Sequence, residues 1–158
     1  MPWPSWSWCC GKVLIMLNKW DLRFLELTAL VGSWSKDPST QVGAAITDSR
    51  NRVISLGFNG PPRGVEDRPD IDRETKLRRT LHAEQNALAF ARHDVTGCTI
   101  YVTHHPCARC AAQIAQAQIT RVVCNAPDPA FATRWADDIA EAKLILNQSG
   151  VVLVSLET

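Results

Sequence analysis

The sequence predicts a three-layer α/β/α sandwich built on a five-stranded mixed sheet. Helical patterns alternate with short β-rich runs along the chain, and a full helical pattern separates the last two β-rich runs. Alternation of this kind places helices on both faces of one sheet. We expect the last two strands to be parallel, because parallel neighbours need a long crossover such as a helix.

The first part of the domain reads as a helix followed by a hairpin. One apolar stripe recurs at spacings of three and four: Leu17, Trp20, Phe24, Leu27, Val31 and Trp34. This spacing predicts a helix that Gly32 and Pro38 bring to an end. The alternating residues 42–46 and the β-rich run 53–58, joined by turn residues, predict a hairpin. Residues 59–72 are rich in Gly, Pro and charge, which predicts a loop.

The second part supplies the remaining helices and strands. A helix is expected to begin near residues 80–82, with Ala83, Ala87 and Phe90 on one side. Strands at 99–102 and 121–124 flank a helix over residues 107–117. Helical spacing from Trp135 to Leu146 predicts the last helix, and residues 151–154 form the last strand.

The first residues differ in character from the rest. Residues 1–16 are rich in Trp and hold the adjacent pair Cys9 and Cys10, whereas Leu17 begins a natural helix start. We expect residues 1–16 to be a leader outside the fold and residues 17–158 to form one domain. The six cysteines are unevenly placed, which does not suggest a disulfide framework. A reducing, cytoplasmic location is therefore expected.

The composition is that of an ordinary globular domain. Of the 158 residues, 46% are hydrophobic and 21% charged, and the formal net charge is +1. No apolar run is long enough to span a bilayer, so no membrane partner is expected. Nucleic-acid binders usually carry a basic face, which this charge balance does not indicate. A small anionic ligand, which needs only two or three cations, remains compatible.

The chemistry concentrates between His82 and Cys110. His82 and Glu84 form an H-x-E pattern, and Pro106, Cys107 and Cys110 form P-C-x-x-C. Together these patterns are the signature of zinc deaminases. A helix beginning at Cys107 would favour thiolates at its positive end. Zinc held by three protein ligands keeps its fourth position for water, so we predict a catalytic zinc on His82, Cys107 and Cys110.

Glu84 is the predicted general acid/base. It lies two residues beyond His82, where it can reach a water on the metal but cannot easily bind the same ion. Zinc lowers the pKa of such a water to about 7. The competing interpretation is a structural zinc site, with Cys98 or Cys124 as fourth ligand and Glu84 as a first-turn charge. We expect Cys98 and Cys124 to be buried thiols instead.

Four blocks of sequence, including this motif, resemble the deoxycytidylate (dCMP) deaminases of the cytidine deaminase-like superfamily. They are residues 35–44, 57–65, 82–87 and 101–111, and the resemblance extends over residues 17–155. It implies hydrolysis of dCMP to dUMP and ammonia in pyrimidine deoxynucleotide metabolism. In that reaction, hydroxide on zinc attacks C4 of the pyrimidine, and Glu84 protonates N3 and then the departing amine.

The resemblance and the residue chemistry also indicate the substrate contacts. The backbone of Ala83 and the segment from Thr103 to Pro106 would hold the ring, and either His104 or His105 could stack on it. A phosphate would meet donors near Lys36, with Arg63 as a second cation for phosphate or effector, unless both are solvated surface charges. The full predicted substrate-binding set is Ser35, Lys36, Asn59, Ala83, Thr103, His104, His105 and Pro106.

Oligomers and effectors follow from the resemblance alone. Some relatives are hexamers regulated by dCTP and dTTP, with Mg²⁺ accompanying the triphosphate. A homo-oligomer, either dimer or hexamer, is therefore expected here, and triphosphate regulation is a weaker hypothesis. A second structural zinc is not expected, because residues 66–80 hold neither Cys nor His.

Three other functions compete with dCMP deamination. Deamination of a polynucleotide base would need a basic track and stacking aromatics. Another free cytosine nucleoside or nucleotide, or guanine, would differ mainly in the groups that meet the sugar and the phosphate. A zinc module without enzyme activity is the alternative from another class.

Overall fold

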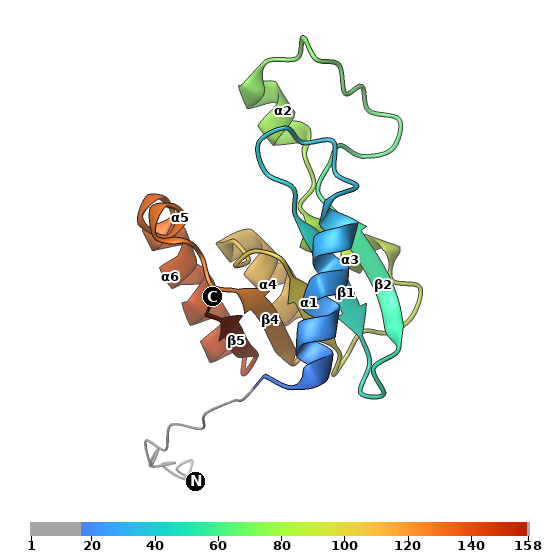
Figure 1. Cartoon of the computed structure of the whole chain (residues 1–158), viewed down its shortest axis with the longest axis vertical. Coiled ribbons are helices and arrows are strands. Elements are labelled where there is room, and N and C mark those ends of the chain that lie inside the picture. The colour runs from blue at the N-terminus through green and yellow to red at the C-terminus, as the bar shows by residue number, and fades with distance from the viewer. Residues whose placement is uncertain (1–16, 158) are drawn as a thin grey trace, which may run out of the picture.

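The computed structural model describes residues 17–157, which form one five-stranded sheet with helices on both faces (Figure 1). The expected leader, residues 1–16, lies outside the described residues. The strands are β1 Gly43–Thr47, β2 Val53–Phe58, β3 Thr99–Val102, β4 Arg121–Asn125 and β5 Val152–Leu156. The helices are α1 Lys19–Gly32, α2 Arg73–Arg79, α3 Ala83–Phe90, α4 Ala108–Gln116, α5 Pro129–Arg134 and α6 Ala136–Gln148.

The sheet is mixed, in the order β2-β1-β3-β4-β5. β1 is antiparallel to both β2 and β3, whereas β3, β4 and β5 are parallel. The predicted sandwich and the parallel final pair are therefore confirmed. Because β3 and β4 run together, their carboxyl ends meet at one edge of the sheet, next to the start of β1. Catalytic and binding residues of open α/β sheets collect at such an edge.

Two cores fill the space between the layers. On one face, α3, α4 and α6 bury small and aliphatic side chains against the sheet, among them Ala87, Ile114 and Leu146. On the other face, α1 packs Phe24 and Leu25 against β3, β4 and β5. Each strand of the parallel set thus contributes side chains to both cores, as expected for a covered sheet.

The buried face of α1 differs from the predicted stripe. Trp20 and Trp34 are exposed, whereas Asp21 and Thr28 are buried in full. The Asp21 carboxylate accepts two hydrogen bonds from Arg121, at 2.7 and 2.9 Å, and one from the Tyr101 hydroxyl at 3.0 Å. Polar residues that are hydrogen-bonded in this way can occupy a buried helix face as apolar residues do. The spacing of apolar residues in the sequence does not predict them.

Two short helices differ from the sequence prediction, which has no helix at either place. α2 follows the loop and projects from the body of the molecule (Figure 1), and none of its residues is buried. α5 begins after Asp128, which accepts hydrogen bonds from the first turn, and it too buries no residue. Helices without a buried stripe lack the periodicity on which the sequence prediction depends. The end of α3 also differs, because Phe90 is exposed rather than packed with Ala83 and Ala87.

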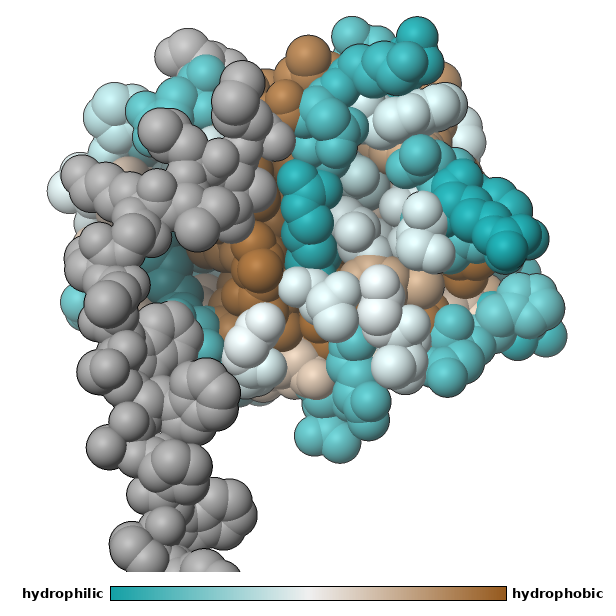
Figure 2. All heavy atoms as spheres, turned by 90° about the horizontal axis from the view of Figure 1, so that it is seen from below, coloured by the Kyte–Doolittle hydropathy of each residue, from teal (hydrophilic) through white to brown (hydrophobic). Residues whose placement is uncertain are grey.

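The surface mixes polar and apolar side chains. Figure 2 shows hydrophobic groups between hydrophilic ones on one end of the molecule. Large apolar side chains that reach solvent include Leu22, Leu30 and Val152. Within residues 17–157, no helix combines the length and apolar character needed to cross a bilayer.

Candidate active site

Three side chains meet with the geometry of a metal site. His82 Nδ1 lies 3.5 Å from Cys107 Sγ and 3.4 Å from Cys110 Sγ. In a zinc tetrahedron with bonds of about 2.05 Å to nitrogen and 2.3 Å to sulfur, these atoms would be about 3.5 Å apart. The three residues therefore fit the ion without rearrangement. His82 is exposed, Cys107 is half-buried and Cys110 is buried, so one side of the site is open to solvent.

Local structure brings these three side chains together at two helix starts. His82 is the residue before α3, where its backbone amide donates to Gln85 Oε1 at 2.8 Å. Cys107 is the residue before α4, and its sulfur accepts the Cys110 amide at 3.4 Å. A Cβ on Gly57 would collide with the Ala83 carbonyl, so only glycine lets β2 approach α3 this closely. Both helix starts present their positive ends to the thiolates.

The two cysteines have different thiol pKa values. The hydrogen bond from Cys110 lowers the pKa of Cys107 to about 4, with His82 adding to the effect. The same contact raises the pKa of Cys110, and burial raises it further. The Cys107 thiolate in turn raises the pKa of His82. Cys107 is thus the more acidic of the two thiols, and a metal held by this cluster would favour deprotonation of Cys110 as well.

Glu84 lies in the first turn of α3 and is 4% exposed. Burial raises its pKa to about 7. A carboxyl group that titrates near neutrality can both take up and release a proton at working pH, which is the property required of a general acid/base. The structure therefore brings the predicted acid/base together with the predicted ligands.

Cys98 and Cys124 do not join this group. Both are buried, and Cys124 lies on β4 beside Ser155. Among the described residues, the candidate metal cluster contains only His82, Cys107 and Cys110. The geometry favours a site with an open position over a structural site with a fourth cysteine.

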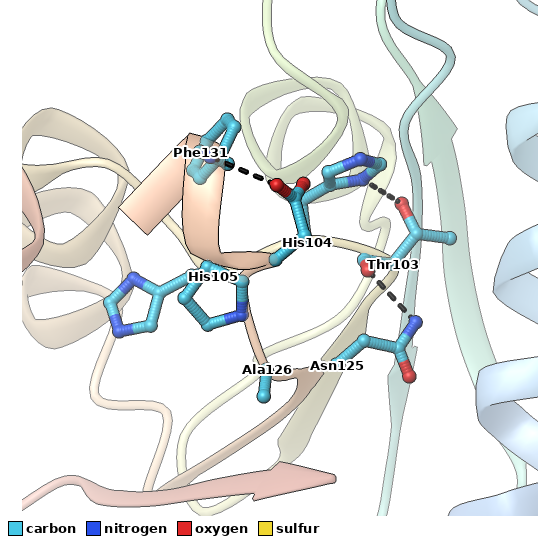
Figure 3. A pocket seen from close by; sticks show the side chains of 8 residues that line it. Thr103, His104, His105, Asn125, Ala126 and Phe131 are labelled. Carbon is cyan, nitrogen blue, oxygen red and sulfur yellow. Dashed lines mark hydrogen bonds between the residues drawn. The ribbon is translucent and has the colours of Figure 1, made fainter. Parts of the chain in front are cut away.

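The two histidines of the segment from Thr103 to Pro106 have different surroundings. The His105 ring is 6% exposed, and its Nδ1–H donates to the Pro106 carbonyl at 2.8 Å. Its Nε2 atom is buried without a partner among the described residues. Both histidines border a hollow, but His104 is the more exposed of the two, and its Nδ1 atom lies 2.9 Å from Thr103 Oγ1 (Figure 3). Burial lowers the pKa of both rings, which favours the neutral form of each. His104 is the better placed of the two to meet a ligand.

A hollow of about 260 Å³ lies beside this segment. Five of its lining residues are absent from the set predicted from the sequence: Asn125, Ala126, Pro127, Asp128 and Phe131. The Asn125 side chain donates to the Thr103 carbonyl at 2.9 Å, which fixes the segment to the end of β4. The sequence held one signal for Asn125: it is a polar residue directly after a predicted strand, and the carboxyl ends of parallel strands border ligand sites.

The predicted phosphate donors fall into two groups. Ser35 and Asn59 are buried and hold the loop before β1: the Ser35 hydroxyl donates to the Asn59 carbonyl, and the Asn59 side chain binds backbone groups of Thr40 and Val42. Lys36 is exposed and has no ion pair among the described residues. Arg63 lies over the Phe90 ring at 5.2 Å. Of the four, Lys36 is the cation left free for an anion.

Comparison with known proteins identifies the family. The model of the cytidine and deoxycytidylate deaminase zinc-binding region matches residues 18–126, more than half of the chain. The chain belongs to this family. A deaminase encoded in the luxG 3′ region of Aliivibrio fischeri is 52% identical over 137 residues, covering 86% of this chain and 92% of the relative. Human deoxycytidylate deaminase is 34% identical over 141 residues, covering 84% and 77%.

The fold of this deaminase also recurs among solved structures. The dCMP deaminase of cyanophage S-TIM5, in complex with dCMP and dUMP, matches with a TM-score of 0.73 at 24% identity. The match covers 89% of this chain and 99% of that one. The resemblance found in the sequence is thus confirmed for family and fold. Family membership and the His/Cys/Cys cluster identify a zinc-dependent deaminase.

Proposed function

We propose that this deaminase hydrolyses dCMP to dUMP and ammonia. The observation that carries the proposal is the cluster of His82, Cys107 and Cys110 beside the buried Glu84. Relatives at 34% to 37% identity bear the name deoxycytidylate deaminase, which supports a deoxycytidine nucleotide as substrate. His82, Cys107 and Cys110 are the proposed zinc ligands, and the sulfur–nitrogen separations of 3.4 and 3.5 Å support them.

When bound, zinc supplies a water that ionises near neutral pH and a positive charge beside the ring. Glu84 carries the protons: its carboxylate accepts one from the attacking water and delivers it to N3 of the pyrimidine. It then takes the proton of the new hydroxyl on C4 and passes it to the amine, which leaves as ammonia while the C4 carbonyl forms. A pKa of about 7 suits both transfers. The Ala83 backbone and the Thr103–Pro106 segment orient the ring, and the neutral His104 ring packs near it.

Lys36 is the proposed contact for the 5′-phosphate. Ser35 and Asn59 hold the loop that carries Lys36, and Asn59 bonds to both ends of that loop. Their contribution is therefore to position Lys36, because these hydrogen bonds already engage the Ser35 hydroxyl and the Asn59 amide. Arg63 is held over Phe90 and is a weaker candidate for a phosphate or an effector.

Assembly and regulation extend the same proposal. We infer a homo-oligomer, a dimer or a hexamer, and regulation by dCTP and dTTP with Mg²⁺, both from the family resemblance alone. Four of the cysteines are free thiols in the described residues, which supports function in a reducing compartment such as the cytoplasm. A hyperbolic rate curve unaffected by either triphosphate would argue against the regulatory part only.

One substrate panel tests the activity. Purified protein is incubated with dCMP, CMP, deoxycytidine, dCTP and a single-stranded oligonucleotide, and ammonia release is followed. dCMP is expected to be the best substrate. Glu84→Gln is expected to abolish turnover while retaining one equivalent of zinc and the fold. The matched control is Glu141→Gln, an exposed substitution on α6, which should turn over normally.

A second variant tests the phosphate contact. Lys36→Gln should lower kcat/KM for dCMP about tenfold and leave that for deoxycytidine unchanged, because only dCMP presents a phosphate. Preference for deoxycytidine or the oligonucleotide in the wild-type protein would contradict the substrate assignment. Turnover that survives in Glu84→Gln would contradict the mechanism.

A further inference from the structure

The start of α4 is held by a side chain from another helix. Asp138 lies in the first turn of α6, and its Oδ2 atom accepts the Ala108 amide at 3.1 Å. Ala108 is the first residue of α4, and it lies between Cys107 and Cys110 in the sequence. The hydrogen bond therefore joins α6 to the short stretch of backbone that carries both proposed sulfur ligands.

The first amides of a helix have no partner within the helix and need acceptors from elsewhere. At the start of α4, Cys107 Sγ accepts the Cys110 amide at 3.4 Å. The Asp138 carboxylate is a second acceptor at the same helix start. Unlike the Cys107 sulfur, this carboxylate is not itself a proposed metal ligand, so metal binding does not compete for it.

Asp138 is committed to α4 rather than to its own helix. Within residues 17–157, its side chain has one hydrogen-bond donor, the Ala108 amide, and no lysine or arginine lies within salt-bridge distance of it. Asp137, the neighbouring acidic residue in the first turn of α6, is exposed. In the described part of the chain, Asp137 makes no side-chain hydrogen bond. The two adjacent carboxylates thus differ in their contact with the helix that carries the cysteines.

Apolar packing alone does not fix the start of α4. The two helices pack against each other on one face of the sheet (Figure 1), with Ile114 of α4 and Ala142 and Leu146 of α6 buried in the shared core. Apolar burial is not directional, whereas a hydrogen bond to a carboxylate is short, strong and directional. The contact from Asp138 therefore restricts the position of the first turn of α4 more closely than the core does.

Asp138 is also close enough to act on the metal cluster. Cys107 makes the largest contribution to the raised pKa of His82, and the Asp138 carboxylate adds a smaller contribution in the same direction. Groups that hold metal ligands in place from behind are part of a metal site, and their loss typically weakens metal binding about tenfold to a hundredfold.

We propose that Asp138 is a positioning residue for the metal centre: by accepting the Ala108 amide, it holds the start of α4 in the orientation that brings both cysteines of that helix start to His82. This inference rests on the proposed function, because it takes the His/Cys/Cys cluster to bind zinc. Asp138 acts through the backbone of α4 as a hydrogen-bond acceptor. An uncharged oxygen at the same position should therefore retain most of its effect.

Zinc affinity, measured by competition with a chromophoric chelator, tests this role. Asp138→Ala should bind zinc at least about tenfold more weakly than the wild type, the range expected for loss of an outer-shell group. Asp138→Asn keeps an oxygen that accepts the Ala108 amide, so it should recover most of this loss. Asp137→Ala removes the same charge from the same helical turn without the contact to α4. It is the matched control and should bind zinc as the wild type does.

Cobalt(II) in place of zinc gives a second measurement, because its absorption depends on the coordination geometry and on the thiolate ligands. The wild type, Asp138→Asn and Asp137→Ala should share one spectrum, whereas Asp138→Ala should lose intensity in the thiolate-to-cobalt band. Leu146→Val, a buried substitution on α6, controls for a general loss of stability. It should lower the melting temperature by a few degrees but leave the zinc affinity and the cobalt spectrum unchanged.

The outcomes separate this inference from the proposed function. A wild-type protein that binds no zinc, or whose cobalt spectrum shows no thiolate ligand, would refute the proposed ligand set and this inference with it. An intact wild-type site with Asp138→Ala unchanged in affinity and spectrum would refute only the role of Asp138. Equal losses in Asp138→Asn and Asp138→Ala would show that the charge acts rather than the hydrogen bond, and this too would overturn the proposal. A similar loss in Leu146→Val would overturn it as well, because the effect would then follow from stability alone.

Discussion

Replacing Glu84 by glutamine is expected to stabilise the metal-free protein while it abolishes turnover. Glu84 is 4% exposed, and burial raises its pKa from 4.5 to about 7. A carboxyl group whose pKa is higher in the folded chain than in the unfolded chain costs stability once it ionises. The cost is absent below the unfolded pKa and grows as pH rises toward the folded pKa.

The magnitude follows from the two pKa values. At about 1.4 kcal/mol per pKa unit, a rise from 4.5 to about 7 corresponds to about 3 kcal/mol above pH 7. Near pH 5 the cost is below about 1 kcal/mol, because the carboxyl is then largely protonated in the folded chain. The neutral amide that Glu84→Gln introduces carries no such cost at either pH, so the difference between variant and wild type should depend on pH.

Urea unfolding at pH 5 and pH 8, with zinc removed by a chelator, measures this difference. Glu84→Gln should exceed the wild type by about 3 kcal/mol at pH 8 and by less than about 1 kcal/mol at pH 5. The exposed control Glu141→Gln should match the wild type at both. A wild-type protein as stable as Glu84→Gln at pH 8 would refute the reasoning, because the acid/base would then not be held against a burial cost.

Three further outcomes are expected. Asp21→Ala should lower the free energy of unfolding in urea by about 3 kcal/mol, because it leaves the half-buried Arg121 guanidinium unpaired; an effect below about 0.5 kcal/mol would contradict this. Cys107→Ser should lose zinc by atomic absorption whereas Cys98→Ser retains one equivalent, and the reverse result would displace the proposed ligand set. His105→Phe should change the free energy of unfolding by less than about 2 kcal/mol, because removal of the buried Nε2 acceptor, which has no partner among the described residues, offsets the lost hydrogen bond from Nδ1–H to the Pro106 carbonyl; a larger loss would show an unseen partner at Nε2.

The sheet and the metal cluster could be predicted because their determinants are local in the sequence. Strands β1 to β5 read as alternating or β-rich runs, and a helix between β4 and β5 requires a parallel pair. Cys107 and Cys110 lie within one helical turn, and the spacing to His82 belongs to a recognisable motif. In these cases the residue pattern and the final geometry carry the same information.

The rest depends on contacts between residues far apart in the chain. Asp21 meets Arg121 across 100 positions, so no local pattern marks it as buried. Asn125 and Asp128 border the hollow only because β4 lies beside β3. The sequence predicts Ser35 and Asn59 as hydrogen-bond donors to a ligand. In the structure, however, their side chains donate to backbone carbonyls of neighbouring loops. Whether a polar side chain is free or already engaged is a property of the packed molecule.

The proposed ligands come from the starts of two separate helices, and His82 and Cys107 are 25 positions apart in the sequence. An ion bound at both helix starts would therefore crosslink them across the chain between them. It would bind the folded chain far more tightly than the unfolded chain. Scarcity of the metal would then affect the stability of the protein as well as its activity. It would shorten the lifetime of the polypeptide, since each departing ion leaves the two helix starts free to separate and the chain open to proteases.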